Sequence, residues 1–327
     1  MLSRAELIAN PTLVKSKSLG SLLGLAVGDA LGDLGRQDEF RKRYGIVTNL
    51  YANAKSTDDT EFALLTARTL IDCAGNLTPD ALMCSWQKRI LDQGGVFERG
   101  GQPLYGAVAN LQRGITPPRS GRDNVAHYDD GAAMRIAPIG IVCAGDVQRA
   151  VALAEIEAQI SHYADGIWAA QAVAASVAVA MVNASVEEII ATGIAQIPRD
   201  SWLGRAMNRA MNICDEEKTI EHAWERLHTE LWTPSHSASA EAIPQIYALF
   251  RLTQGDFKRG MFWACNFGRD ADTLGAVVGA LSGAMRGVEI IPQTWVEAVR
   301  KPAGVCLKFA ANEDIVDLAT RLANLIR

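Results

Sequence analysis

Apolar residues recur three and four positions apart along most of this chain, a spacing that lines one face of an α-helix. The apolar–polar alternation that is typical of half-buried strands is rare. Thr78 followed by Pro79 opens one expected helix, which ends at Gly94, and Ser185 with Glu188 forms a capping box that opens another. The same spacing predicts further helices over residues 18–31, 59–74, 147–159, 166–182, 202–214, 238–253, 257–265, 273–286 and 314–326. The pattern therefore predicts an all-α fold.

Nothing in the sequence divides these expected helices into separate units, because there is no internal repeat and no low-complexity linker. We expect a single compact multi-helix domain over residues 18–327, preceded by a short N-terminal arm over residues 1–17 that is free to move. Residues 94–131 are the least regular stretch and carry several glycines, charges and the pair Pro117-Pro118. Such a stretch inside a compact domain is more often a functional loop than a floppy surface loop, and both interpretations stay open.

Two sets of glycines repeat at every fourth position. They are Gly20, Gly24, Gly28 and Gly32 in the first expected helix, and Gly275, Gly279, Gly283 and Gly287 in a late one. Glycine inside a helix costs roughly 1 kcal/mol relative to alanine, so close approach of two helices is needed to offset the loss. A membrane dimer motif is the alternative, but Asp29 and the short apolar length argue against it. We expect both helices at the centre of the bundle, with the end of the first near the start of the second.

Two clusters of aspartates and threonines come directly before expected helices. The first is Ser56-Thr57-Asp58-Asp59-Thr60, and the second is Gly268-Arg269-Asp270-Ala271-Asp272-Thr273. Taken alone, either cluster is most simply a helix cap. Stacked carboxylates repel one another unless a cation lies among them, and hard oxygen ligands suit Mg²⁺, Mn²⁺ or Ca²⁺. Four carboxylates exceed what one Mg²⁺ usually takes from a protein, so the clusters indicate a site for two divalent ions.

Composition narrows the class of protein further. The chain has 327 residues, of which 49% are hydrophobic and 21% charged, as in a globular protein with a sizeable core. The net charge of −5 and the scattered basic residues argue against nucleic-acid binding. No signal peptide and no membrane-spanning stretch is evident, and the six cysteines form no Cys-x-x-Cys pair. We therefore expect a cytoplasmic protein with reduced core cysteines, and the histidine spacing does not favour zinc.

Five motifs in fixed order resemble those of the ADP-ribosylglycohydrolases, which include the dinitrogenase-reductase-activating glycohydrolases and the ADP-ribosylarginine hydrolases. They are Gly28-Asp29-Ala30-Leu31-Gly32, Thr57-Asp58-Asp59-Thr60, the stretch from Gly131 to Gly140, Ser161-His162, and the stretch from Asn266 to Thr273. Each motif is weak alone, but five in order are specific. The resemblance spans residues 18–287, nearly the whole chain.

The resemblance implies an all-α domain with a dinuclear Mg²⁺ or Mn²⁺ centre. The implied metal ligands are Thr57, Asp58, Asp59, Asp270, Asp272 and Thr273. In such enzymes the two ions hold the hydroxyls of the ribose distal to adenine and polarise the sugar. A further carboxylate then activates water or protonates the leaving group.

Two glutamates are candidates for that carboxylate. Many relatives place a glutamate where this chain has Arg36, whereas the arginine-specific branch places it in a later Glu-Phe pair, which Glu39-Phe40 matches. Glu39 is therefore the favoured acid/base, and a solvated surface residue is the alternative. Glu98 is the second candidate, because Glu98-Arg99-Gly100 stands where relatives often have Asp-x-Gly.

Substrate contacts are implied by position in two further loops. The candidates are Gly100, Gly101, Tyr128, Asp130, Gly131, Ala132 and His162. The loop that enters Gly131 usually faces the diphosphate, and here Asp129 and Asp130 add two negative charges beside it. His162 is placed near the ribose or phosphate by the resemblance, and a hydrogen-bonded core histidine is the alternative.

Three functions remain open on these grounds. The favoured one is a metal-dependent hydrolase that removes ADP-ribose from a modified protein, with arginine as acceptor, and thus reverses an ADP-ribosyltransferase that would be its cognate partner or a toxin. The second is hydrolysis of another N-glycoside or of a free ADP-ribose derivative. The third is a non-catalytic protein that binds ADP-ribose or blocks a partner through the N-terminal arm.

Overall fold

The computed structural model describes residues 1–50 and 54–326, and within them the regular secondary structure is helical. The first nine α-helices are α1 (Arg4–Ile8), α2 (Pro11–Arg36), α3 (Asp38–Tyr44), α4 (Asp58–Asp72), α5 (Pro79–Arg89), α6 (Gln102–Gln112), α7 (Arg119–Arg122), α8 (Ala137–Val142) and α9 (Val147–Ala158). The others are α10 (Asp165–Ala180), α11 (Val186–Ile194), α12 (Trp202–Glu217), α13 (Ile220–Thr229), α14 (Ser239–Leu252), α15 (Phe257–Cys265), α16 (Ala271–Arg286), α17 (Gln293–Val299) and α18 (Ile315–Ala323). Short 3₁₀ turns are η1 (Leu91–Gln93), η2 (Val288–Ile290) and η3 (Lys308–Asn312). The all-α prediction is confirmed.

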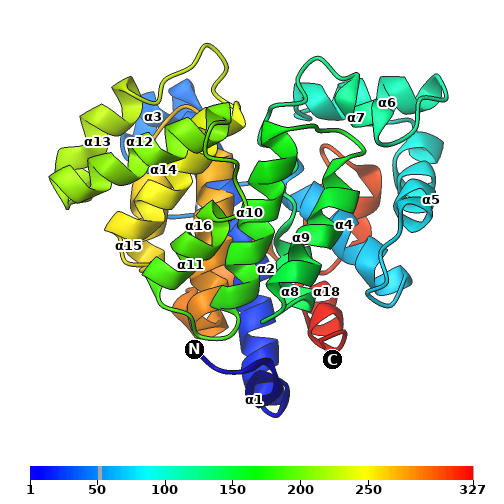
Figure 1. Cartoon of the computed structure of the whole chain (residues 1–327), viewed down its shortest axis with the longest axis horizontal. Helices are drawn as coiled ribbons and strands as arrows, with labels where there is room; N and C mark the ends of the chain where they lie inside the picture. The colour runs from blue at the N-terminus through cyan, green and yellow to red at the C-terminus, as the bar shows by residue number, and fades with distance from the viewer. Residues whose placement is uncertain (51–53, 327) are drawn as a thin grey trace.

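The two glycine-bearing helices, α2 and α16, lie side by side through the middle of the molecule (Figure 1). Their backbones touch along the whole contact: a Cβ on Gly28 would lie 1.9 Å from the carbonyl oxygen of Gly275, and one on Gly24 would lie 2.3 Å from that of Gly279. No side chain larger than hydrogen fits at these positions. The close packing of the two backbones offsets the free-energy cost of placing glycine inside a helix. The contact brings the C-terminal end of α2 beside the first turn of α16, as predicted.

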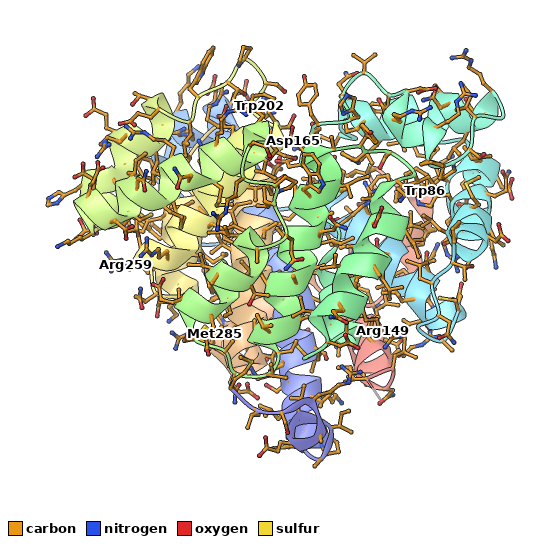
Figure 2. All side chains as sticks on the ribbon, in the orientation of Figure 1. Trp86, Arg149, Asp165, Trp202, Arg259 and Met285 are labelled. Atoms are coloured by element: carbon orange, nitrogen blue, oxygen red, sulfur yellow. The ribbon has the colours of Figure 1, made fainter. Side chains whose placement is uncertain are left out.

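The remaining helices form layers around this pair. α10 is apolar on nearly all sides and packs against α8, α9, α11 and α16, so it is buried almost throughout. α12 to α14 form one upper part of the molecule and α5 to α7 the other (Figure 1). Trp86 of α5 is fully buried against Phe62 of α4, whereas Arg259 of α15 extends outward from the surface (Figure 2).

The N-terminal segment is packed onto the domain rather than free. α2 begins at Pro11 instead of Ser18, and α1 precedes it behind a capping box. Leu7 is fully buried, and the backbone N–H of Leu2 donates to the carbonyl of Val182 at 2.7 Å. Lys17 is also buried, and its ammonium group donates to three backbone carbonyls, so residues 11–17 belong to the central helix.

The stretch 94–131 is more regular than expected. It contains α6 and the short α7, with irregular backbone on either side of them. The helix α6 was not expected in this least regular stretch, and its apolar positions, such as Leu104 and Leu111, bury one face of it.

The cysteines are free thiols, but only four of the six are buried. Cys84 is exposed and Cys73 half-buried, contrary to the expected core positions. Among the helices that the structure describes, none is long and apolar enough to cross a membrane.

Candidate active site

A cavity of about 300 Å³ lies where α2 ends and where α4 and α16 begin. The two aspartate clusters meet in it, as the packing of α2 on α16 predicts. Its lining residues are Arg36, Asp58, Asp59, Arg99, Gly100, Gly101, Gln102, Leu104, Asp129, Asp130, Gly131, Met134, His236, Ser237, Asp270, Asp272 and Thr273. This is a strongly acidic site at the junction of three helices and two loops.

The first cluster is held by a buried aspartate of α2. Asp29 accepts hydrogen bonds from the backbone N–H and hydroxyl of Thr57, at 2.8 and 2.6 Å, and from the same two groups of Thr60, at 3.2 and 2.5 Å. Burial raises the pKa of Asp29 to about 7, against the effect of these bonds. Asp29 thus fixes the first turn of α4 and presents Asp58 and Asp59 to the cavity. Thr57 is turned toward Asp29 and does not line it.

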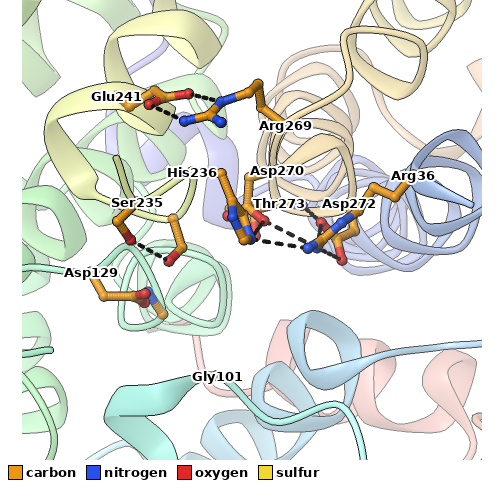
Figure 3. Close-up of polar contacts among 12 residues, drawn as sticks. Arg36, Gly101, Asp129, Ser235, His236, Glu241, Arg269, Asp270, Asp272 and Thr273 are labelled. Carbon is orange, nitrogen blue, oxygen red and sulfur yellow. Dashed lines mark hydrogen bonds and ion pairs between the residues drawn. The ribbon is translucent and has the colours of Figure 1, made fainter. Parts of the chain in front are cut away.

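The second cluster starts α16 and is paired with an arginine. Nη1 of Arg36 lies 2.5 Å from both carboxylate oxygens of Asp272 and 3.1 Å from Oδ1 of Asp270 (Figure 3). Thr273 lines the cavity beside them. Burial raises the pKa of Asp270 to about 7, with Asp272 adding to the rise and Arg36 opposing it.

The acidic groups of the cavity raise one another's pKa. Burial is the main cause for Asp58, Asp59 and Asp130, and neighbouring carboxylates add to it, so all three pKa values lie well above the usual range. Oδ1 of Asp59 and Oδ2 of Asp130 are buried without a hydrogen-bond donor. Buried acceptors that lack a donor are the chemistry that a hard cation satisfies, so these residues fit a divalent ion.

The side chains do not form a ready-made metal cage. Among the residues that the structure describes, no group of three His, Cys, Asp or Glu side chains converges closely enough to hold an ion as it stands. The donor set therefore fits a divalent cation in kind, and binding would draw the carboxylates together.

The two glycine loops form the opposite wall. Gly100, Gly101, Asp130 and Gly131 all line the cavity, as predicted. The backbone N–H of Gly101 donates to Oδ2 of Asp58 at 3.0 Å, which ties this loop to α4. The loop of Asp130 is tied to the segment before α14, because its N–H donates to the carbonyl of Ser237 at 2.8 Å.

Three predicted substrate residues stand behind this wall rather than in it. Ala132 is fully buried, and half-buried Tyr128 packs its ring on that of Trp202. His162 is fully buried, with Nδ1 at 2.8 Å from the Ser161 hydroxyl and Nε2 at 3.8 Å from Asp129. Burial lowers the pKa of His162 to about 4, so it is neutral near pH 7.

The arginine of the Gly-Ala-Ala-Met-Arg motif supports the same wall from behind. Arg135 is fully buried and donates to the carbonyl of Gly131, to Glu157 and to the Ser161 hydroxyl, at 2.8, 2.7 and 2.8 Å. It therefore holds the loop that carries Gly131 in place, and its contribution to the site is positional.

The two glutamates proposed as acid/base groups lie elsewhere. Glu39 is exposed on α3, and Glu98 is exposed in the loop before α6; neither lines the cavity. Position in a motif could not predict this, because α3 turns away from the end of α2. Asp129 and Asp130 are the carboxylates that line the cavity outside the two clusters.

Sequence reasoning missed the positively charged part of the site. Arg36 was noted as a departure from the family pattern, but its pairing with Asp270 and Asp272 was not predicted. Arg99, which forms an ion pair with Asp33, and His236, which comes from a loop far along the chain, were also missed. The one available signal was the spacing that puts Arg36 one turn beyond Gly32, on the face of α2 that meets α16.

Comparisons with known proteins agree with this architecture. The sequence profile of the ADP-ribosylglycohydrolase family matches residues 10–327. An ADP-ribosyl-[dinitrogen reductase] glycohydrolase of Rhodospirillum rubrum is 28% identical over 86% of this chain and 90% of its own length. An ADP-ribosylarginine hydrolase of Pseudomonas putida is 24% identical over 88% of this chain and 76% of its own.

A solved structure shows the same fold. It is described as an ADP-ribosylglycohydrolase-related protein complex, is 24% identical, and superposes with a TM-score of 0.63 over 97% of this chain and all of its own. The helical architecture, the motif order and the profile match over almost the full length agree. This chain belongs to the ADP-ribosylglycohydrolase family.

Proposed function

We propose that this protein is a divalent-cation-dependent hydrolase that removes ADP-ribose from a modified protein side chain, with ADP-ribosylarginine as the favoured linkage. Family membership and the two named hydrolases support release of ADP-ribose from a protein. The observation that carries the proposal is the meeting of both aspartate clusters in one cavity, where Asp59 and Asp130 keep buried oxygens without a donor. An ADP-ribosyltransferase that makes the modification is the implied counterpart.

The cation would be Mg²⁺ or Mn²⁺, since every group offered to it is an oxygen. The residues that the sequence offers for holding it are Asp58, Asp59, Asp270, Asp272 and Thr273. Asp130 lines the cavity with them, and Arg36 already engages Asp270 and Asp272. When bound, it would supply positive charge beside the ribose hydroxyls and so polarise the sugar.

The other lining groups would bind and orient the substrate. Arg99 leaves 42% of its side chain exposed at the cavity, where it could exchange Asp33 for a phosphate group of ADP-ribose. The loop of Gly100 and Gly101 places backbone without side chains against the sugar, so that the ribose can approach Asp58 closely.

Hydrolysis adds water to C1 of the ribose distal to adenine and breaks its bond to the acceptor nitrogen. A proton must leave the water, and one must reach the departing guanidine nitrogen. In this structure Asp129 is better placed for those transfers than Glu39 and Glu98, because it lines the cavity and they do not.

The test is release of ADP-ribose from an ADP-ribosylarginine protein with Mg²⁺, with Mn²⁺ and with EDTA. We expect release by the wild type only with metal, and none by Asp58→Asn. A matched control is Asp72→Asn, at the far end of the same helix α4, which should behave as wild type. Metal-independent release would contradict the proposal. Tight ADP-ribose binding without release would instead indicate a binding protein, and no binding would reject the assignment to ADP-ribose.

A further inference from the structure

Arg36 stands inside the second aspartate cluster as a cation belonging to the protein itself. Its Nη1 approaches both oxygens of Asp272 at 2.5 Å and Oδ1 of Asp270 at 3.1 Å, and its Nη2 lies 3.1 Å from Nε2 of His236 (Figure 3). Only 30% of the Arg36 side chain is exposed, against 3% for Asp272 and 5% for Asp270. The guanidinium is therefore a partly buried ion that engages both aspartates.

The backbone holds Arg36 at this place. Gly32, one turn earlier on α2, is so close to the start of α16 that a Cβ would lie 2.1 Å from the carbonyl oxygen of Ala271. Arg36 is the last residue of α2, and Asp270 and Asp272 are at the start of α16. Burial opposes the charge on Arg36, but Asp272 and Asp270 outweigh it and raise the pKa of the guanidinium, so it stays charged.

Two other carboxylates of the cavity have free acceptors instead. Oδ1 of Asp59 and Oδ2 of Asp130 have no hydrogen-bond partner, and these residues are 1% and 2% exposed. Asp272, in contrast, has both oxygens bound by Arg36. A divalent ion bound to Asp272 would lie within hydrogen-bond reach of the guanidinium, and the like charges would repel. Arg36 and an ion are thus alternatives at Asp272.

We propose that Arg36 takes the place of one of the two expected cations, so that this chain binds a single divalent ion through Asp58, Asp59 and Asp130. The proposal rests on the divalent cation of the proposed function and replaces the two-ion expectation from the sequence. The guanidinium neutralises Asp270 and Asp272, and it offers its outward N–H groups to the substrate as a fixed point of positive charge.

The experiment counts bound Mn²⁺ per chain, by calorimetric titration and by the loss of free-Mn²⁺ signal in electron paramagnetic resonance. Wild type should bind one ion. Arg36→Gln, which keeps polar bulk but removes the charge, should bind two, and Arg36→Lys should bind one. Arg99→Gln is the matched control: it removes an arginine from the same cavity wall, but one paired with Asp33, and should bind one. Circular dichroism spectra would check that each variant is folded, and Arg36→Met repeats the charge removal.

Two ions in the wild type would show that Arg36 yields to metal and would overturn the proposal. One ion in both wild type and the two uncharged variants would overturn it as well, because no second position would have been opened. The absence of any bound Mn²⁺ in all variants would overturn both this proposal and the metal of the proposed function. The count needs no substrate, so release of ADP-ribose by a two-ion wild type would preserve the function and remove only this inference.

Discussion

The carboxylate of Glu241 accepts two hydrogen bonds from the guanidinium of Arg269, at 2.5 and 2.9 Å (Figure 3). Glu241 is fully buried in the first turn of α14 and also accepts the backbone N–H of Thr233 at 2.6 Å. Arg269 has a φ of +57° and directly precedes Asp270. The pair therefore fixes the left-handed turn from which the second aspartate cluster enters the cavity.

Removal of the negative charge of Glu241 should lower both the stability and the activity of the protein. We expect Glu241→Gln to lower the free energy of unfolding by about 3 kcal/mol, because it leaves a partly buried arginine without its counter-ion. ADP-ribose release should also fall, because Asp270 loses its anchored neighbour. Urea unfolding and turnover would measure the two effects. Glu221→Gln, which breaks the exposed ion pair with Arg259, is the control and should change neither.

The contact between α2 and α16 predicts a strong dependence on glycine. Gly24→Ala should lower the free energy of unfolding by about 3 kcal/mol, because its Cβ would overlap the backbone of Gly279. Gly114 has open space around it and a φ of +78°, so Gly114→Ala should cost only about 1 kcal/mol of backbone strain. Chemical denaturation would give the free energy of unfolding of both variants. It would thus compare the cost of a steric overlap in Gly24→Ala with the cost of backbone strain in Gly114→Ala. Equal losses would mean that the helices separate easily.

The raised pKa of Asp270 predicts how stability depends on pH in the metal-free protein. Its pKa is about 7 in the folded state against 3.8 for the free side chain, mainly because of burial. Between about pH 4 and 7 the folded protein keeps a proton that the unfolded chain releases, so the folded state loses stability as pH rises. Asp270→Asn lacks the contribution of Asp270 to this loss, so its stability relative to wild type should increase across this window.

Urea unfolding in EDTA at several pH values between 4 and 7 would measure this difference. His162, with a pKa lowered to about 4, acts in the opposite direction over much of the same range. It is present in both proteins, so its contribution cancels when the variant is compared with the wild type. A difference that does not change with pH would contradict the prediction.

The position of the glutamates predicts which carboxylates matter for turnover. Glu39→Gln and Glu98→Gln should leave kcat within about threefold of wild type, because both side chains are exposed outside the cavity. Asp130→Asn should lower kcat by roughly 100-fold, the size of the loss when a positioned group of the site is removed, because Asp130 would no longer hold the cation. Steady-state release of ADP-ribose would rank the three variants. A large loss in Glu39→Gln alone would show that α3 moves over the cavity during the reaction.

Much of the fold follows from local sequence. The long helices have the apolar spacing that predicted them, and α4 covers Asp58–Asp72 against an expected 59–74. The four-residue helix α7 was not predicted, because so short a helix carries too little periodicity to stand out. α6 was not predicted either, although it is as long as α5. The segment before Ser18 was misjudged for a related reason: the burial of Lys17 depends on carbonyls of Ala180, Ala284 and Met285, which are remote in sequence.

The sequence by itself determined that α2 and α16 pack closely and that both aspartate clusters meet, because glycines at every fourth position have no other use in a buried helix. It also determined the acidic, oxygen-rich chemistry of the site. Only the tertiary structure decided that Arg36 lies between Asp270 and Asp272 while Glu39 points outward. Long side chains at a helix end can reach several places, and which place they take depends on what the neighbouring helices put within reach.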